Sequence, residues 1–208
     1  SVTIYALSKA MLFRVSESFS SVLGGITASI GHLISDKNTK KLIEIRYKLL
    51  RYNFIFGCLI VSYFVCFNNS FIGLWVDSSN YIGESGNLAL CFGGFFTLLC
   101  LANEIFINSF QLFKTKSRIL LVIVFIFLVT AYFFSKEYGL IGIAMSLFVT
   151  KFIQWMGYEI LLQRHIAIRK ANILLDNYKT FIFLIVVLLL RFYFIKFETE
   201  SWVIYIFQ

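Results

Sequence analysis

Long apolar runs separated by short polar connections dominate this sequence from one end to the other. A helix needs about 20 predominantly apolar residues to cross a bilayer. The pattern therefore predicts an all-α integral membrane protein, a polytopic bundle of about six transmembrane helices plus a truncated seventh that begins at Ser201. We expect one transmembrane domain over residues 1–208. The six spans are expected at residues 4–34, 50–68, 87–112, 118–135, 138–162 and 178–197, the fourth being the shortest and dependent on its flanks.

The first run, residues 4–35, is predicted to be one long helix that contains Lys9, Arg14 and Glu17. At about 100° per residue, Glu17 lies about 80° and Arg14 about 140° around the helix from Lys9. Charges in membrane helices cost about 2.5–3.5 kcal/mol each at the bilayer centre and persist where they face a bundle interior or a wet cavity. Small residues fall in or near the same sector: Ser20, Ser21, Gly24, Ala28 and Gly31.

Three structural interpretations of this charged and small face stay open. Lys9 and Arg14 can extend their ammonium and guanidinium groups to the membrane surface. Arg14 and Glu17 are three residues apart and can form an ion pair with each other. The small residues can form a close contact between helices.

The charges of the connections alternate along the chain. The six successive connections contain six, none, three, one, four and one Lys or Arg residues. Because cytoplasmic connections carry the excess of Lys and Arg, the odd-numbered connections are expected inside the cell and residue 1 outside. The first connection, residues 36–51, also has helical spacing. It either lies along the inner surface as an amphipathic helix or extends the second span into the cytosol, which we favour.

Composition agrees with a membrane location. The chain is 59% hydrophobic and 14% charged, with a mean hydropathy of +0.82, whereas soluble domains are about 45–50% apolar and about 25% charged. The net charge of +8 would suggest a nucleic-acid partner in a soluble protein. Here its distribution reports orientation instead, and we expect no nucleic-acid binding. The sequence contains no proline, so bends must come from Gly or Ser positions.

Two later spans also contain polar side chains. In the third span, Glu104, Asn108 and Gln111 fall within about 60° of one another and form one stripe near the cytoplasmic side. The fifth span places Lys151 near its middle, with Glu159 about 80° away around the helix. A lysine inside the membrane predicts a functional site. The alternative is a purely structural ion pair between Lys151 and a carboxylate such as Glu104 or Glu17.

Enzymatic chemistry finds little support. His32 and His165 have no partner at ligand or triad spacing, and no phosphate-binding glycine loop, catalytic carboxylate pair or zinc motif occurs. The four cysteines lie in apolar runs without metal-binding spacing and are expected to act as small packed residues. We expect no enzyme, metal or cofactor.

Three stretches carry a resemblance to a known family. They are FIGLWVDSSNYIG, GLIGIAMSLFVTKFI and YALSKAMLFRVSESFSSVLGGITASIGHL, the last followed by a Lys-rich connection. Together they resemble the polysaccharide-biosynthesis flippases (O-antigen and capsule translocases) of the multidrug/oligosaccharidyl-lipid/polysaccharide exporter superfamily. One departure is that the first helix lacks the proline common near its cytoplasmic end. Gly24, Gly25 and Gly31 are candidates to supply the bend.

The resemblance implies the second lobe of a MATE-like two-lobe transporter of 14 helices, beginning at the eighth helix. The first lobe is then missing from this chain, whose start at Ser1 and stop at Gln208 we take as a piece of a longer protein. It further implies a multi-pass protein of the bacterial cytoplasmic (inner) membrane. Its function would be to move undecaprenyl-pyrophosphate-linked oligosaccharide to the outer leaflet, with H⁺ or Na⁺ as a candidate coupling ion.

The residues agree with that function without naming the glycan. Basic groups in the membrane suit an anionic pyrophosphate, and carboxylates can pair with them or carry a coupling ion. A cation-coupled multidrug exporter is the alternative, but it requires an acidic cavity. A non-transporting membrane subunit is the third candidate and predicts fixed polar contacts throughout. The candidate substrate-binding residues are Lys9, Arg14, Glu17, Glu104, Asn108 and Lys151.

Overall fold

The computed structural model describes residues 2–166 and 178–193. Over these ranges the chain is helical and contains no strand. The helices are α1 (Val2–Gly24), α2 (Ile26–Ser35), α3 (Thr39–Trp75), the short 3₁₀ helix η1 (Ser78–Asn80), α4 (Glu84–Ser109), α5 (Phe113–Tyr138), α6 (Leu140–Ile166) and α8 (Tyr178–Tyr193). The seventh span expected from Ser201, the end of the sixth and the basic residues Arg169, Lys170 and Lys196 lie outside the described residues.

Four of the described helices are long and apolar enough to cross a membrane: α3, α4, α5 and α6. They correspond to the expected spans at 50–68, 87–112, 118–135 and 138–162. The prediction of one uninterrupted helix over residues 4–35 is wrong, because the helix is broken at Gly25 into α1 and the ten-residue α2. Consecutive glycines at 24 and 25 lower the helical propensity there. The break thus lies at a glycine, as was expected for a helix without proline. Gly31, which was also a candidate for the bend, lies within α2.

Helix α3 is longer than a span needs to be. Its 37 residues correspond to roughly 55 Å at 1.5 Å per residue, against about 30 Å of hydrocarbon. It begins at Thr39 after the Asn38 side chain accepts a hydrogen bond of 3.2 Å from the Lys41 amide. The interpretation that residues 36–51 extend the second span is therefore confirmed, and a separate in-plane helix is not present.

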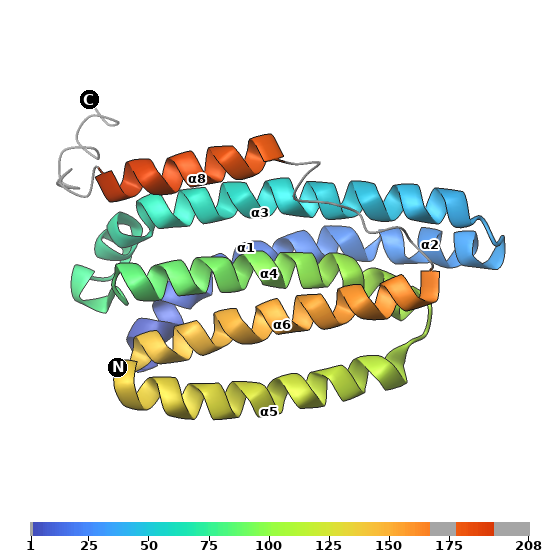
Figure 1. The fold of residues 1–208 in the computed structure, drawn as a ribbon. Helices are drawn as coiled ribbons and strands as arrows, with labels where there is room; N and C mark the ends of the chain where they lie inside the picture. Colours follow the sequence, from blue (N-terminus) through green and yellow to red (C-terminus); the bar gives the residue numbers. More distant parts are fainter. Residues whose placement is uncertain (1, 167–177, 194–208) are drawn as a thin grey trace.

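Helix α4 is the centre of the bundle and packs against α1, α2, α3 and α6. In Figure 1 it lies between α3 on one side and α6 on the other, with α1 and α2 behind it. Of its most apolar stretch, 72% is buried, compared with 6% for α5. Helix α5 packs chiefly on α6 and turns its remaining surface outward. Its exposed side chains are large and apolar, among them Leu121, Phe125, Leu128 and Tyr132.

Connections of like charge lie at the same end of the bundle. Figure 1 shows the α2–α3 and α4–α5 connections at one end, and the α3–α4 and α5–α6 connections at the other. The first pair belongs to the Lys- and Arg-rich connections and the second to the poor ones. We call these the basic end and the basic-poor end. The alternation of basic and basic-poor connections along the sequence thus places the two kinds of connection at opposite ends of the bundle.

Helices α5 and α6 form a hairpin joined by Gly139 alone. Gly139 has a φ of 58°, which favours glycine because it lacks a Cβ. Three residues later, a Cβ on Gly142 would lie only 2.1 Å from the carbonyl oxygen of Phe134. The two backbones therefore cross at a distance that only glycine permits. The expected connection of residues 135–139 is largely helical, which gives α5 the flanking length that it was predicted to need.

Candidate functional site

The charged residues of α1 lie on different sides of that helix. The Arg14 Nη1 atom is 3.2 Å from the Glu17 Oε2 atom, so the predicted ion pair is present. Its side chains are 80% and 65% exposed, so the pair faces away from the described bundle. Lys9 is half-buried, and its Nζ atom lies 4.6 Å from the ring centroid of Phe13 and 5.6 Å from that of Tyr5. The aromatic faces stabilise this ammonium without neutralising it.

Arg14 lies near the middle of the bundle's length. Leu12, two residues before it, is buried against Gly94, where an added Cβ would be 2.8 Å from the Leu12 side chain. Gly94 is close to the midpoint of α4, the central helix. Two helical residues advance the chain by about 3 Å. Arg14 is therefore at the same level as the centre of α4, and not at either end.

Lys151 also lies at this level, on α6. Its backbone carbonyl is 3.8 Å from the Sγ atom of Cys100, which is buried on α4. Its Nζ donates a hydrogen bond of 3.0 Å to Gln154 Oε1. The proposed structural pairing of Lys151 with Glu104 or Glu17 is not observed, and none of the ion pairs among residues 2–166 and 178–193 includes Lys151. Lys151 is near enough to Lys9 for their charges to repel.

Glu104 and Asn108 instead share a lysine from the next helix. The Lys116 Nζ atom lies 3.5 Å from Glu104 Oε2 and donates to Asn108 Oδ1 at 3.2 Å. The Tyr158 hydroxyl donates to Glu104 Oε1 at 3.2 Å. Gln111 does not continue this stripe, because α4 ends at Ser109 and Gln111 has a left-handed φ of 56°. The third span was thus predicted to begin and end three residues too late, at the correct length of 26 residues.

Arg46, one of the six basic residues expected in the first connection, is buried, which was not predicted. Its side chain is 3% exposed, and its guanidinium forms an ion pair with Glu159 of α6 and donates to Asn103 Oδ1 of α4 at 3.3 Å. The signal was present in the helical spacing. Arg46 follows Leu42 by four residues and precedes Leu49 by three, and both leucines are buried in the core. A base on the apolar face of a helix needs a buried partner.

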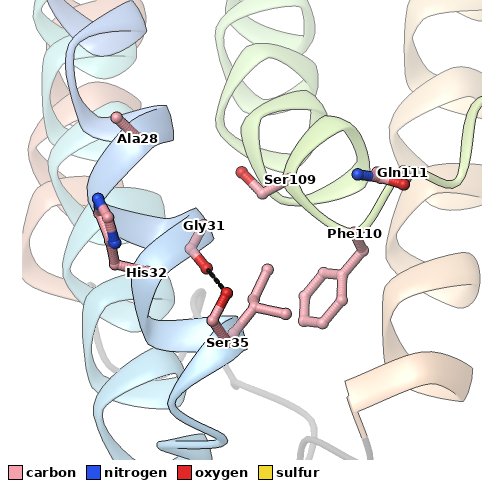
Figure 2. Close-up of a pocket in the computed structure, with 8 residues that line it drawn as sticks. Ala28, Gly31, His32, Ser35, Ser109, Phe110 and Gln111 are labelled. Atoms are coloured by element: carbon pink, nitrogen blue, oxygen red, sulfur yellow. Dashed lines mark hydrogen bonds between the residues drawn. The ribbon is translucent and has the colours of Figure 1, made fainter.

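A pocket of about 550 Å³ opens at the basic end between α2 and the end of α4. Figure 2 shows Gly31 and Ser35 of α2 on one side and Ser109 and Phe110 on the other. Ser35 and Ser109 donate their hydroxyl hydrogens to backbone carbonyls of their own helices. Gly31 and Ala28 line this pocket, so at these positions the small residues do not form the close helix–helix contact that was one interpretation.

Within residues 2–166 and 178–193, no group of three or more His, Cys, Asp and Glu side chains lies close enough together to hold a metal ion. The four cysteines are free thiols, three of them buried. The polar groups described above are cations, amides and the three carboxylates of Glu17, Glu104 and Glu159, and they come from α1, α3, α4, α5 and α6. Comparison of the sequence with models of protein families and with curated proteins finds no match.

Proposed function

We propose that this chain forms one lobe of a flippase for lipid-linked oligosaccharide. The substrate is carried on undecaprenyl pyrophosphate and moves from the inner to the outer leaflet of the bacterial cytoplasmic membrane. The basic end of the bundle faces the cytoplasm, in accord with the distribution of Lys and Arg. The observation that supports this function best is the surplus of positive charge at the middle level of the bundle, where Lys151 has no carboxylate partner among the described residues.

The exposure of Arg14 adds to this argument. An arginine at the bilayer centre costs about 2.5–3.5 kcal/mol on insertion scales, and the described bundle does not cover it. That cost falls when the outward face of α1 borders a water-filled cavity shared with a second lobe. Arg14 and Glu17 then border this cavity, and the half-buried Lys9 and Lys151 add positive charge beside it. Such a surface suits the diphosphate of a polyprenyl headgroup.

The two other functions fit this charge balance less well. A multidrug exporter binds organic cations and requires an acidic cavity, but basic groups predominate at the middle level. A subunit without transport activity requires that each polar group have a fixed partner. Lys151 donates a hydrogen bond to Gln154 and Lys9 lies over two aromatic rings, but neither lysine is in any of the ion pairs of residues 2–166 and 178–193, so their charges are not neutralised.

The function is tested by flipping in proteoliposomes. The full-length protein is reconstituted with a fluorescent, short-chain polyprenyl-pyrophosphate oligosaccharide, and transfer between leaflets is followed by quenching with dithionite. We expect Arg14→Ala and Lys151→Ala each to slow flipping by about tenfold or more, because a hydrogen bond to a charged group contributes about 1.5–3 kcal/mol. Arg14→Lys should be intermediate, since the charge stays and the planar fork is lost.

Arg51→Ala is the matched control, because Arg51 is an exposed cation on α3 at the end of the basic segment that precedes the apolar run. The double variant Arg14→Ala/Glu17→Ala separates a ligand from a structural partner. If Arg14 only neutralises Glu17, the double variant recovers wild-type flipping. If Arg14 binds the headgroup, flipping by the double variant stays slow. Wild-type rates in both alanine variants, or no flipping by the unmodified protein, would contradict the proposal.

A further inference from the structure

A continuous series of hydrogen bonds runs from Lys151 to Glu104. Lys151 Nζ donates to Gln154 Oε1 at 3.0 Å, and Gln154 Nε2 donates to the Tyr158 hydroxyl at 3.0 Å. The Tyr158 hydroxyl in turn donates to Glu104 Oε1 at 3.2 Å. We call these four residues the α4–α6 hydrogen-bond chain. It connects the middle level of the bundle to the ion pair between Glu104 and Lys116 nearer the basic end.

The direction of each bond in this chain is fixed by its first member. A lysine ammonium can only donate, so Gln154 must turn its oxygen toward Lys151 and its NH₂ group toward Tyr158. The Tyr158 hydroxyl accepts that hydrogen bond, which leaves its own hydrogen for Glu104. Glu104 must then accept. The ammonium of Lys151 therefore determines, through the orientation of Gln154, that the Tyr158 hydroxyl donates its hydrogen to Glu104.

The chain is enclosed by the bundle. Gln154 is 3% exposed and Tyr158 is fully buried. The carboxylate of Glu104 and the ammonium of Lys116 are partly buried. Water competes poorly for hydrogen bonds in such a place, so each bond depends strongly on its neighbours. Loss of one partner leaves a buried polar group unsatisfied, and a change at one end has to be accommodated at the other.

We propose that Tyr158 is a positioning residue that couples headgroup binding at Lys151 to the contact between α4 and α6 at Glu104. This inference rests on the proposed flippase function. When a pyrophosphate engages Lys151, the ammonium leaves Gln154 Oε1. The Gln154 amide can then turn and accept from the Tyr158 hydroxyl, which withdraws from Glu104. Glu104 is left to Lys116 of α5, and the hydrogen bond that joins α4 to α6 near the basic end is lost.

Coupling of this kind is reciprocal. If headgroup binding weakens the Tyr158–Glu104 bond, then a weaker bond must strengthen headgroup binding by the same factor. Glu104→Gln removes the charge that strengthens the hydrogen bond from Tyr158. This substitution is far from the headgroup, yet it should tighten binding. Tyr158→Phe removes the hydroxyl, so the charge at Glu104 should no longer influence Lys151 through the chain.

The test is a double-mutant cycle on binding by the full-length protein in detergent, with fluorescent farnesyl pyrophosphate as the probe. We expect Glu104→Gln to lower the dissociation constant by about fivefold, the lower range of allosteric coupling. In the Tyr158→Phe background the same substitution should have no effect. Gln154→Met interrupts the chain at a second place and should likewise abolish the effect of Glu104→Gln. Tyr132→Phe, on the exposed surface of α5, is the matched control. In this background Glu104→Gln should still lower the dissociation constant.

Two results overturn the inference in distinguishable ways. An effect of Glu104→Gln that persists in both the Tyr158→Phe and Gln154→Met backgrounds shows coupling through space, and it eliminates the role of Tyr158 while the headgroup site stands. Absence of probe binding in the unmodified protein eliminates the headgroup site, and the coupling with it. Thermal unfolding of each variant establishes that it is folded before its binding is compared.

Discussion

At the scale of single residues, burial separates Arg46 from the other bases of its segment. Its side chain is 3% exposed, whereas that of Lys48, two residues later, is 59% exposed. Both belong to ion pairs, with Glu159 and Glu44 respectively. The first pair joins α3 to α6, and the second joins neighbouring turns of α3. Their contributions to stability should therefore differ widely.

We predict that Arg46→Met lowers the free energy of unfolding by about 3–5 kcal/mol, because it leaves the carboxylate of Glu159 buried without a partner. Lys48→Met, its matched control, should change it by less than about 1 kcal/mol, as is usual for exposed pairs. Thermal or denaturant unfolding in detergent micelles measures both. Equal effects of the two substitutions on the free energy of unfolding would show that the Arg46–Glu159 ion pair does not stabilise the packing of α3 against α6.

The sequence predicted which polar residues lie inside the bundle better than it predicted their partners. Lys151 and Glu104 could be placed within spans from helical spacing alone. Their partners depend on how α4, α5 and α6 are aligned along their lengths, which no spacing within one helix determines. Glu104 consequently binds Lys116 from α5, where a pair with Lys151 was one expectation. Arg46 was missed because its segment was judged by its charge and not by its apolar face.

At the scale of elements, apolar length identified α3 to α6, but not their ends. Helices can continue through polar residues beyond the apolar run until a cap or turn ends them. In α3 the helix begins at Thr39, after the capping residue Asn38, well before the apolar run. The α5–α6 hairpin is the extreme case, with one residue between the helices. It depends on the absence of a side chain at Gly142, a requirement that hydropathy does not reveal.

We predict that Gly142→Ala opens the α5–α6 hairpin and destabilises the protein. Its Cβ would meet the Phe134 carbonyl oxygen at 2.1 Å, and a backbone atom of a helix cannot move aside alone. Gly31→Ala is the control, since a Cβ there has nothing within 4 Å. It should stabilise α2 by about 0.5–1 kcal/mol, because alanine is the better helix former. Unfolding midpoints that fall for Gly31→Ala but not for Gly142→Ala would contradict this account.

At the scale of the whole molecule, the separation of charge between the two ends is the property from which we predict topology. The basic end includes the start of α3, and the basic-poor end includes η1. Both segments have exposed positions suited to labelling, Thr39 and Ser79. We expect each to lie outside the hydrocarbon, on opposite sides of the membrane.

We predict that a cysteine at Ser79 reacts with a membrane-impermeant thiol reagent added to intact cells, and that a cysteine at Thr39 reacts only after the membrane is permeabilised. The native cysteines are replaced for this measurement. The physical reason is the retention of Lys and Arg on the cytoplasmic side during insertion. The opposite labelling pattern would reverse the orientation of all the spans.

The contrast between α5 and α1 also has a consequence for biosynthesis. Helix α5 has an apolar surface nearly all round, so it can enter lipid as soon as it leaves the translocon. Helix α1 precedes α5 in the chain but carries Lys9, Arg14 and Glu17, which lipid alone accommodates poorly. Its lasting place requires α4, against which Leu12 packs and which is synthesised later. The order in which these helices settle in the membrane is therefore not the order in which the ribosome makes them.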